Sequence, residues 1–501
     1  MRLREQLVSQ RAKLRALALV LVPLAVVLVR APLDSYPLTL LCFAVLALAV
    51  MTLWTPREPP LAMMVVVYQW LQASTKLLHA NLLGIPLNDM LVAGSFGAMH
   101  PVMGALGEAT VLSLLGLLTL VGGLALARRL LPLTADPVSA VAPEPSGTRI
   151  LQRLVVATLI TIAGSSVLKN LQYSLPGSVT QIILPLIDLK WALVFALTCA
   201  VFRSRAGYAW LAVICGAEVV LGFAAYFSAW KEVILILVLG YFFCRPGFEL
   251  RRVALGFGLV LLGLGLAVFW TAIKVEQRQF LNQGTGQQVV VRGTSESLAN
   301  AFDLAAATEV DEYAEAANRL AERIAYVDYF ANALLHVPAV RAHEGGALWW
   351  RAVTHIFTPR ILFPDKPPLL SDSEQTMYYT GLRLASSFEG TSISLGYMAE
   401  SYIDFGVPGM FVPIFFWGLV LGLGMRLLVA RFGAVDLVWG TAAVVMLNSL
   451  ILEVTAVKMV GGTLMSIIVM FLTLNHLGAW AYRQIYSERV VSSIPDSKPF
   501  P

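Results

Sequence analysis

The sequence of 501 residues is 58% hydrophobic and only 13% charged, and its mean hydropathy is +0.74. This balance excludes a soluble globular domain, because repeated apolar runs approach the length that crosses a hydrocarbon core of roughly 30 Å. The formal net charge of +5 reflects the membrane topology argued below and requires no nucleic-acid partner. We therefore expect an all-α, polytopic integral membrane protein in contact with membrane lipids.

About twelve apolar segments are expected to cross the membrane as helices. The first follows a basic tail and lacks a clear small-residue cleavage site, so we expect a retained helix and not a signal peptide. The stretch 79–108 is broken by Gly and Pro residues and is expected to be a re-entrant or interfacial segment. The expected spans are 14–31, 37–54, 61–78, 109–130, 150–168, 183–202, 207–227, 230–244, 253–273, 406–428, 434–454 and 459–480.

The basic residues predict how these spans are oriented. With the N-terminus in the cytoplasm, 20 of the 36 Lys and Arg residues fall in short cytoplasmic loops and tails. Both termini are then cytoplasmic, in the inner membrane of a bacterium. Four regions follow: a transmembrane bundle of about nine spans (1–273), a large periplasmic loop with amphipathic and interfacial helices (274–405), three further spans (406–480) and a cytoplasmic tail (481–501).

Cysteine and histidine usage argues against disulfides and metals in the loop. All four cysteines lie in expected spans, so the loop does not depend on disulfides. The sequence "HEGG" at 343–346 lacks the second histidine of a zinc helix motif, and we expect no metal site and no cofactor. Several polar residues inside the expected spans either line a cavity or pair between helices: Asp188, Lys190, Glu218, Glu453, Lys458, Asn475 and His476.

The loop 274–405 is too long to be a mere connection and is expected to carry the function. It holds 10 basic and 16 acidic residues. Between Glu309 and Leu335 apolar residues recur at spacings of three and four, which predicts one amphipathic helix lying over the outer ends of the spans.

Residues 349–358 begin a dense polar stretch. Trp349 and Trp350 have amphipathic rings of the kind found at the headgroup level, so they are expected to anchor the loop to the membrane surface. Arg351 and His355 are four residues apart and share a face if this segment is helical.

The segment that follows, "PRILFPDKPP" at 359–368, is expected to be extended and rigid because its four prolines fix φ. It presents Arg360 and Lys366, a guanidinium fork and a compact charge of the kinds that bind phosphate. The alternative is that these cations extend over lipid headgroups.

Between 371 and 381 the sequence predicts a short helix. Ser371 and Glu374 form a capping box, and Gly381 ends the helix. Tyr378 and Tyr379 within it either stack on sugar rings or lie in the membrane interface.

Further on, Gly396, Glu400 and Asp404 follow one another at spacings of four, so one helical face carries a small residue and two carboxylates. An ionisable group where a helix meets the bilayer is a functional candidate. The alternative is that Glu400 pairs with a loop arginine and only holds the loop down.

Two of these segments carry a family resemblance. "PRILFPDKP" at 359–367 and "GTSISLGYMAESYIDFG" at 390–406 resemble Wzy-type polymerases of O-antigen or exopolysaccharide repeat units. Elsewhere the similarity is one of topology, and the first outer segment, 79–108, is short where some members have two comparable loops. The resemblance implies a GT-C-like membrane glycosyltransferase that joins undecaprenyl-pyrophosphate-linked oligosaccharides at the periplasmic face without a metal.

The same resemblance suggests roles for the polar residues. A departing pyrophosphate needs positive charge, and the acceptor hydroxyl needs a base. For the base we favour Glu400, with Glu389 and Asp404 behind it and His355 as a weaker candidate. For the pyrophosphate the candidates are Arg351, Arg360, Lys366 and Arg383.

Other functions remain open at this point. The chain could be an O-antigen ligase, which transfers finished glycan to a lipid core, or a flippase or exporter of lipid-linked oligosaccharide. A polymerase would work with a chain-length regulator and a separate flippase as partners.

Overall fold

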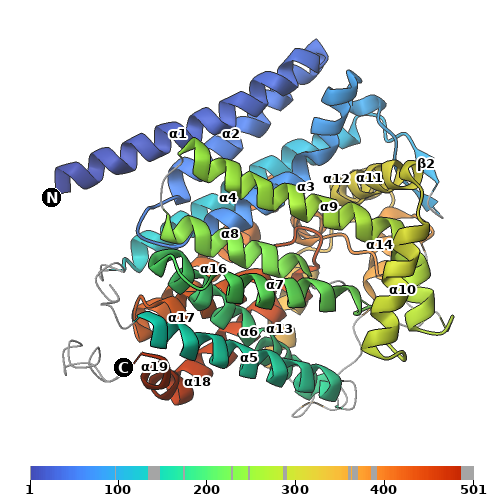
Figure 1. Ribbon diagram of the computed structural model, residues 1–501. Coiled ribbons are helices and arrows are strands. Elements are labelled where there is room, and N and C mark those ends of the chain that lie inside the picture. The colour runs from blue at the N-terminus through green and yellow to red at the C-terminus, as the bar shows by residue number, and fades with distance from the viewer. Residues whose placement is uncertain are drawn as a thin grey trace.

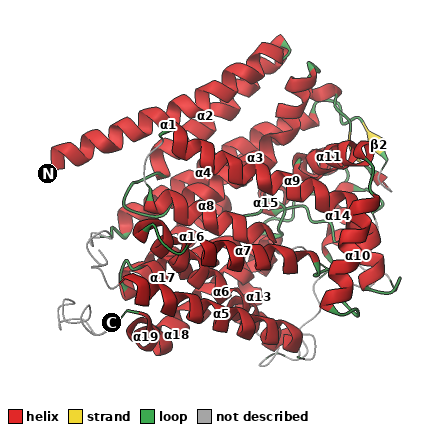
Figure 2. Cartoon of the chain, in the orientation of Figure 1, coloured by secondary structure: helices red, strands yellow, loops and turns green. Residues whose placement is uncertain are grey.

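The computed structural model describes residues 2–95, 98–133, 147–172, 175, 177–226, 230–245, 249–285, 290–358, 363, 370–384 and 392–486. Within these residues the chain is predominantly helical (Figure 2). The strands described are the two-residue β1 (Val92–Ala93) and β2 (Met99–His100), which pair antiparallel. The expected all-α class is confirmed.

Nineteen α-helices are described over these ranges. The N-terminal part contains α1 (Arg2–Arg30), α2 (Tyr36–Leu53), α3 (Leu61–Leu83), α4 (Ala105–Leu130), α5 (Gly147–Leu171), α6 (Gly177–Ser204), α7 (Tyr208–Phe223), α8 (Trp230–Cys244) and α9 (Leu250–Leu281). The next helices are α10 (Thr294–Ala307), α11 (Val310–Ile324), α12 (Val327–His336), α13 (Ala347–Phe357) and α14 (Asp372–Thr380). The last are α15 (Tyr397–Gly409), α16 (Phe411–Phe432), α17 (Asp436–Leu447), α18 (Ala456–Thr473) and α19 (Ala479–Ile485).

Each of the twelve expected spans overlaps at least one of these helices. Among the described residues, seven helices are long and apolar enough to cross a membrane: Leu33–Leu53, Ala105–Leu130, Arg149–Lys169, Val179–Ser204, Val253–Leu281, Phe411–Phe432 and Ala456–Ile485. By length and composition the chain is thus a helical membrane protein. Helix α17 has only 12 residues and rises about 18 Å, short of a hydrocarbon core of roughly 30 Å.

Four helices of the segment 274–405, here called the loop helices, gather at one end of the molecule: α10, α11, α12 and α14. In Figure 1, α10, α11, α12 and α14 lie on the right, whereas the first residues of α1 and α19 lie on the left. The long helices run between these two ends, so the loop helices cover one end of the bundle.

One prediction for the segment 274–405 differs from the structure. The stripe from Glu309 to Leu335 forms two helices and not one, because the chain leaves helical geometry at Ala325. Of these two helices, α12 is deeply buried and α11 lies at the surface. The break between them lets Val327 and Phe330 of α12 enter the core, which one straight helix along the surface would not allow. The stretch 79–108 begins as the end of α3 and then forms β1, β2 and the start of α4.

Helices α4 and α16 approach so closely that glycines are required at the crossing. A Cβ atom added to Gly418 would lie 2.5 Å from the backbone oxygen of Leu120. A Cβ atom added to Gly123 would lie 2.2 Å from the backbone oxygen of Phe415. Small residues of this kind let membrane helices pack backbone to backbone.

We therefore expect Gly418→Val to lower the free energy of unfolding by about 3 kcal/mol, the upper end of the range for overpacking, because backbone atoms must move apart. Thermal unfolding of the purified protein in detergent would measure it. Gly258→Ala is the control, since outside the backbone of its own helix no atom lies within 4 Å of its added Cβ. Equal stability of the two variants would contradict the close packing.

Candidate functional site

A polar cavity of about 250 Å³ lies where α13 and α14 meet α15 and the start of α18. Four stretches of chain, far apart in the sequence, contribute its walls. The lining residues are Leu348, Arg351, Leu370, Ser371, Asp372, Gln375, Ser392, Glu400, Thr455, Val457 and Lys458. The fold thus brings two cations and two carboxyl groups to one small cavity.

Glu400 lies in the first turn of α15 and is 1% exposed. Its Oε1 accepts a hydrogen bond from Gln375 Nε2 at 2.6 Å, and its Oε2 accepts one from the backbone N–H of Ala456 at 2.6 Å. Ala456 is the first residue of α18, where unpaired N–H groups attract negative charge.

Burial has the larger influence on this carboxyl group and raises the pKa of Glu400 to about 8, although both hydrogen bonds oppose the rise. The Glu400 carboxyl group therefore gains and loses its proton at about pH 8, close to neutral. A carboxyl group with such a pKa is suited to general acid–base chemistry.

Asp404 lies one turn further along α15 and accepts hydrogen bonds at the start of α13, as Glu400 does at the start of α18. Its two carboxylate oxygens accept hydrogen bonds from the backbone N–H groups of Leu348 at 3.0 Å and Trp349 at 2.8 Å. These N–H groups lie at the start of α13, so Asp404 satisfies donors that the helix itself cannot pair. Burial raises the pKa of Asp404, and these two hydrogen bonds oppose the rise. Asp404 does not line the cavity, and its contacts give it the role of holding α13 to α15.

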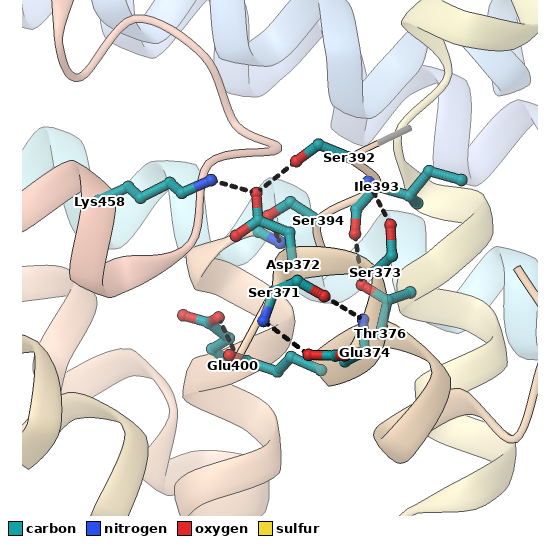
Figure 3. A network of polar contacts seen from close by, with 12 residues as sticks. Ser371, Asp372, Ser373, Glu374, Thr376, Ser392, Ile393, Ser394, Glu400 and Lys458 are labelled. Carbon is teal, nitrogen blue, oxygen red and sulfur yellow. Dashed lines mark hydrogen bonds and ion pairs between the residues drawn. The ribbon is translucent and has the colours of Figure 1, made fainter. Parts of the chain in front are cut away.

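Lys458 and Asp372 form an ion pair at the cavity. The Lys458 ammonium lies 2.5 Å from Asp372 Oδ2, which also accepts a hydrogen bond from the Ser392 hydroxyl at 2.9 Å. Figure 3 shows Asp372 between these two partners. The Lys458 side chain is 57% exposed and that of Asp372 is 10% exposed.

The expected capping box is confirmed and places this wall of the cavity. The Ser371 hydroxyl accepts a hydrogen bond from the Glu374 N–H, and the Glu374 carboxylate accepts one from the Ser371 N–H (Figure 3). Gly381 ends the helix with φ +70°. The Ser373 hydroxyl accepts from the Ile393 N–H at 3.1 Å, which ties the following segment to α14. Asp372 and Gln375 are thereby fixed on one short helix.

Of the other residues that the sequence suggested for the site, only Arg351 lines the cavity among those the structure describes. Arg351 is exposed in the cavity wall, and among the described residues its guanidinium forms no hydrogen bond or ion pair. Arg383 is exposed outside the cavity, and its backbone N–H donates to Ser95 Oγ at 2.9 Å. His355 is half-buried on α13 and does not line the cavity. Arg360, Lys366 and Glu389 lie outside the described residues.

The aromatic candidates separate into buried and exposed rings. Trp349 is buried, and its Nε1 donates to Ser401 Oγ at 2.9 Å, so its ring holds α13 against α15. Trp350 is 70% exposed, and its role as a membrane anchor stays a prediction. Tyr379 is buried, and its hydroxyl donates a hydrogen bond to Glu344 Oε1 at 3.0 Å. Tyr378 is exposed, and the Arg341 guanidinium lies over its ring.

Sequence reasoning missed Asp372 and Gln375 as site residues and placed Lys458 among the polar residues of the spans. Lys458 was open to two interpretations, and the structure gives it both a cavity position and a partner from the loop. By contrast, Lys190 and Glu218 pair between α6 and α7 at 2.5 Å. The signal available for Asp372 was its place next to the capping box, which suggests a helix start but no partner.

Comparisons with known proteins give a family without an activity. A sequence model described as "Domain of unknown function (DUF8712)" matches residues 141–477, which include every residue that lines the cavity. No curated protein and no solved structure matches the chain. Within the described ranges, no group of three or more His, Cys, Asp and Glu side chains is placed to hold a metal ion.

Proposed function

The chain belongs to the DUF8712 family of unknown function, and we propose from its cavity that it is a membrane glycosyltransferase that polymerises oligosaccharide repeat units carried on undecaprenyl pyrophosphate. The observation that carries this proposal is one cavity with a buried carboxyl group, Glu400, and two cations, Arg351 and Lys458. These are the groups that a glycosyl transfer with a pyrophosphate leaving group requires.

In the proposed reaction a hydroxyl on the non-reducing end of one lipid-linked repeat attacks the anomeric carbon of another. The bond between that carbon and the pyrophosphate oxygen breaks, and undecaprenyl pyrophosphate leaves. Glu400 takes the proton from the attacking hydroxyl. Arg351 and Lys458 stabilise the negative charge that develops on the leaving group.

We also propose how the chain is threaded through the membrane. We propose twelve spans in a bacterial inner membrane with both termini in the cytoplasm, so that the cavity opens to the periplasm. In the span 434–454 the helix α17 covers only 12 residues, and the non-helical residues after it would complete the crossing inside the protein. The overall arrangement would be GT-C-like. Arg360 and Lys366, in the segment that resembles the polymerases, would add to the cationic wall. A flippase would supply the substrate, and a chain-length regulator would limit the product.

Purified protein in lipid vesicles that contain a synthetic undecaprenyl-pyrophosphate-linked repeat unit tests the proposal. We expect a ladder of lipid-linked glycans that lengthens with time. Transport of the unaltered substrate across the bilayer without lengthening would instead indicate a flippase. Transfer that requires an added lipid-core acceptor would indicate a ligase, and either result would overturn the proposal.

A further inference from the structure

The ion pair between Lys458 and Asp372 joins two residues whose places on their helices are unequal. Lys458 lies in the first turn of α18, where a positive charge is unfavourable beside the unpaired N–H groups. Asp372 lies in the first turn of α14, where a negative charge is favourable. The start of α18 therefore attracts negative charge, and in this structure the carboxyl groups of Glu400 and Asp372 provide that charge.

Asp372 is not required to cap its own helix. Ser371 and Glu374 complete the capping box of α14, and the Asp372 carboxylate is instead directed to Lys458 and Ser392 (Figure 3). If it lost Lys458, the carboxylate would still be stabilised by the Ser392 hydroxyl and by the N-terminus of α14. Asp372 can therefore give up its cation at little cost.

The ion pair itself is easily exchanged. The Lys458 side chain is 57% exposed, and pairs with so exposed a cation contribute little net free energy. An incoming anion with several oxygens could bind Lys458 and the nearby Arg351 together, which one carboxylate does not do in this structure. A pyrophosphate group has this charge and shape.

We propose that Lys458 binds the pyrophosphate of the lipid-linked substrate, and that Asp372 is an internal stand-in for that pyrophosphate, which the substrate displaces. This inference rests on the proposed function for the identity of the anion. Asp372 competes with the ligand for Lys458, so an acidic residue in the binding site weakens binding. A residue with a merely structural role would have no such effect.

Calorimetric titration of the purified full-length protein in detergent, at fixed ionic strength, tests this competition. The probes are inorganic pyrophosphate and a short-chain prenyl pyrophosphate. We expect Lys458→Met to weaken the binding of both probes by about tenfold, the size of effect expected for a hydrogen bond to a charged group. We expect Asp372→Asn to tighten it by about fivefold, because an ion pair with so exposed a cation contributes up to about 1 kcal/mol. Tighter binding of the prenyl probe than of the inorganic one identifies a lipid-linked ligand and not free pyrophosphate.

Glu374→Gln is the matched control. The substitution changes the charge of α14 by the same amount, and Glu374 does not line the cavity. Its affinity for pyrophosphate should stay close to that of the wild type, and thermal unfolding checks that all variants are folded. Unchanged or weaker binding by Asp372→Asn, or equal tightening by Glu374→Gln, would overturn the stand-in role. Glycan lengthening in vesicles is measured separately, so a failure here leaves the proposed function open to its own test.

Discussion

Glu400→Gln should lower the rate of glycan lengthening by about 10²- to 10⁴-fold, the usual contribution of a general base. Glutamine keeps the shape of the side chain and can still accept a hydrogen bond from Ala456, but it cannot take a proton. The wild-type rate should rise about tenfold per pH unit and level off above about 8, because that is the pKa to which burial raises Glu400. The vesicle assay, run across a pH series, measures both effects.

The control for this substitution is the other carboxylate of α15. Asp404→Asn removes charge from the same helix, but Asp404 holds the start of α13 and lies outside the cavity lining. We expect it to lower thermal stability and to move the pH dependence of lengthening only slightly, to lower pH, because the Asp404 charge is a minor influence on the raised pKa of Glu400. A Glu400→Gln protein that lengthens glycans at the wild-type rate would remove Glu400 from the reaction.

The raised pKa of Glu400 also makes a prediction for stability. Folding raises this pKa from 4.5 to about 8, so the native state binds the proton more tightly than the unfolded state. Glu400 thus contributes stability that is fully present below pH 4.5 and is lost as the pH rises through about 8. In Glu400→Gln, unfolding monitored over this range should lose that part of its pH dependence.

Lys76→Met should lower the free energy of unfolding by about 3–5 kcal/mol, because it leaves a buried carboxylate without its cation. Lys76 on α3 lies 3.1 Å from Asp328 Oδ2 on α12, and the two residues are 2% and 3% exposed. Burial raises the pKa of Asp328, and the Lys76 ammonium opposes the rise. This pair joins the loop helices to the bundle, so its loss should loosen that end of the molecule.

Adding Asp328→Asn to Lys76→Met provides the matched control. The asparagine carries no charge, and its side-chain oxygen can still accept the hydrogen bond that Asp328 receives from the Ala93 N–H. We expect the double variant to regain about half or more of the lost stability, because the unpaired charge is gone. Thermal unfolding in detergent measures all three proteins, and a double variant less stable than Lys76→Met would contradict the ion-pair explanation.

Features that depend on nearby residues could be predicted from the sequence. Long apolar runs predicted helices at all twelve expected positions, because crossing a hydrocarbon core requires a continuous apolar helix. The capping box of Ser371 and Glu374 and the stop at Gly381 needed only residues within ten positions of one another. The spacing of Glu400 and Asp404 placed them on the same helix at one end of the bundle.

Features that depend on distant residues were decided by the tertiary structure alone. Lys458 and Asp372 are 86 positions apart in the chain, and no local pattern relates them. The same spacing that put Glu400 and Asp404 on one helix could not show that one meets the start of α18 and the other the start of α13. Periodicity determines which residues share a helical face, but packing determines what that face meets, and burial of Glu400 by that packing is what raises its pKa.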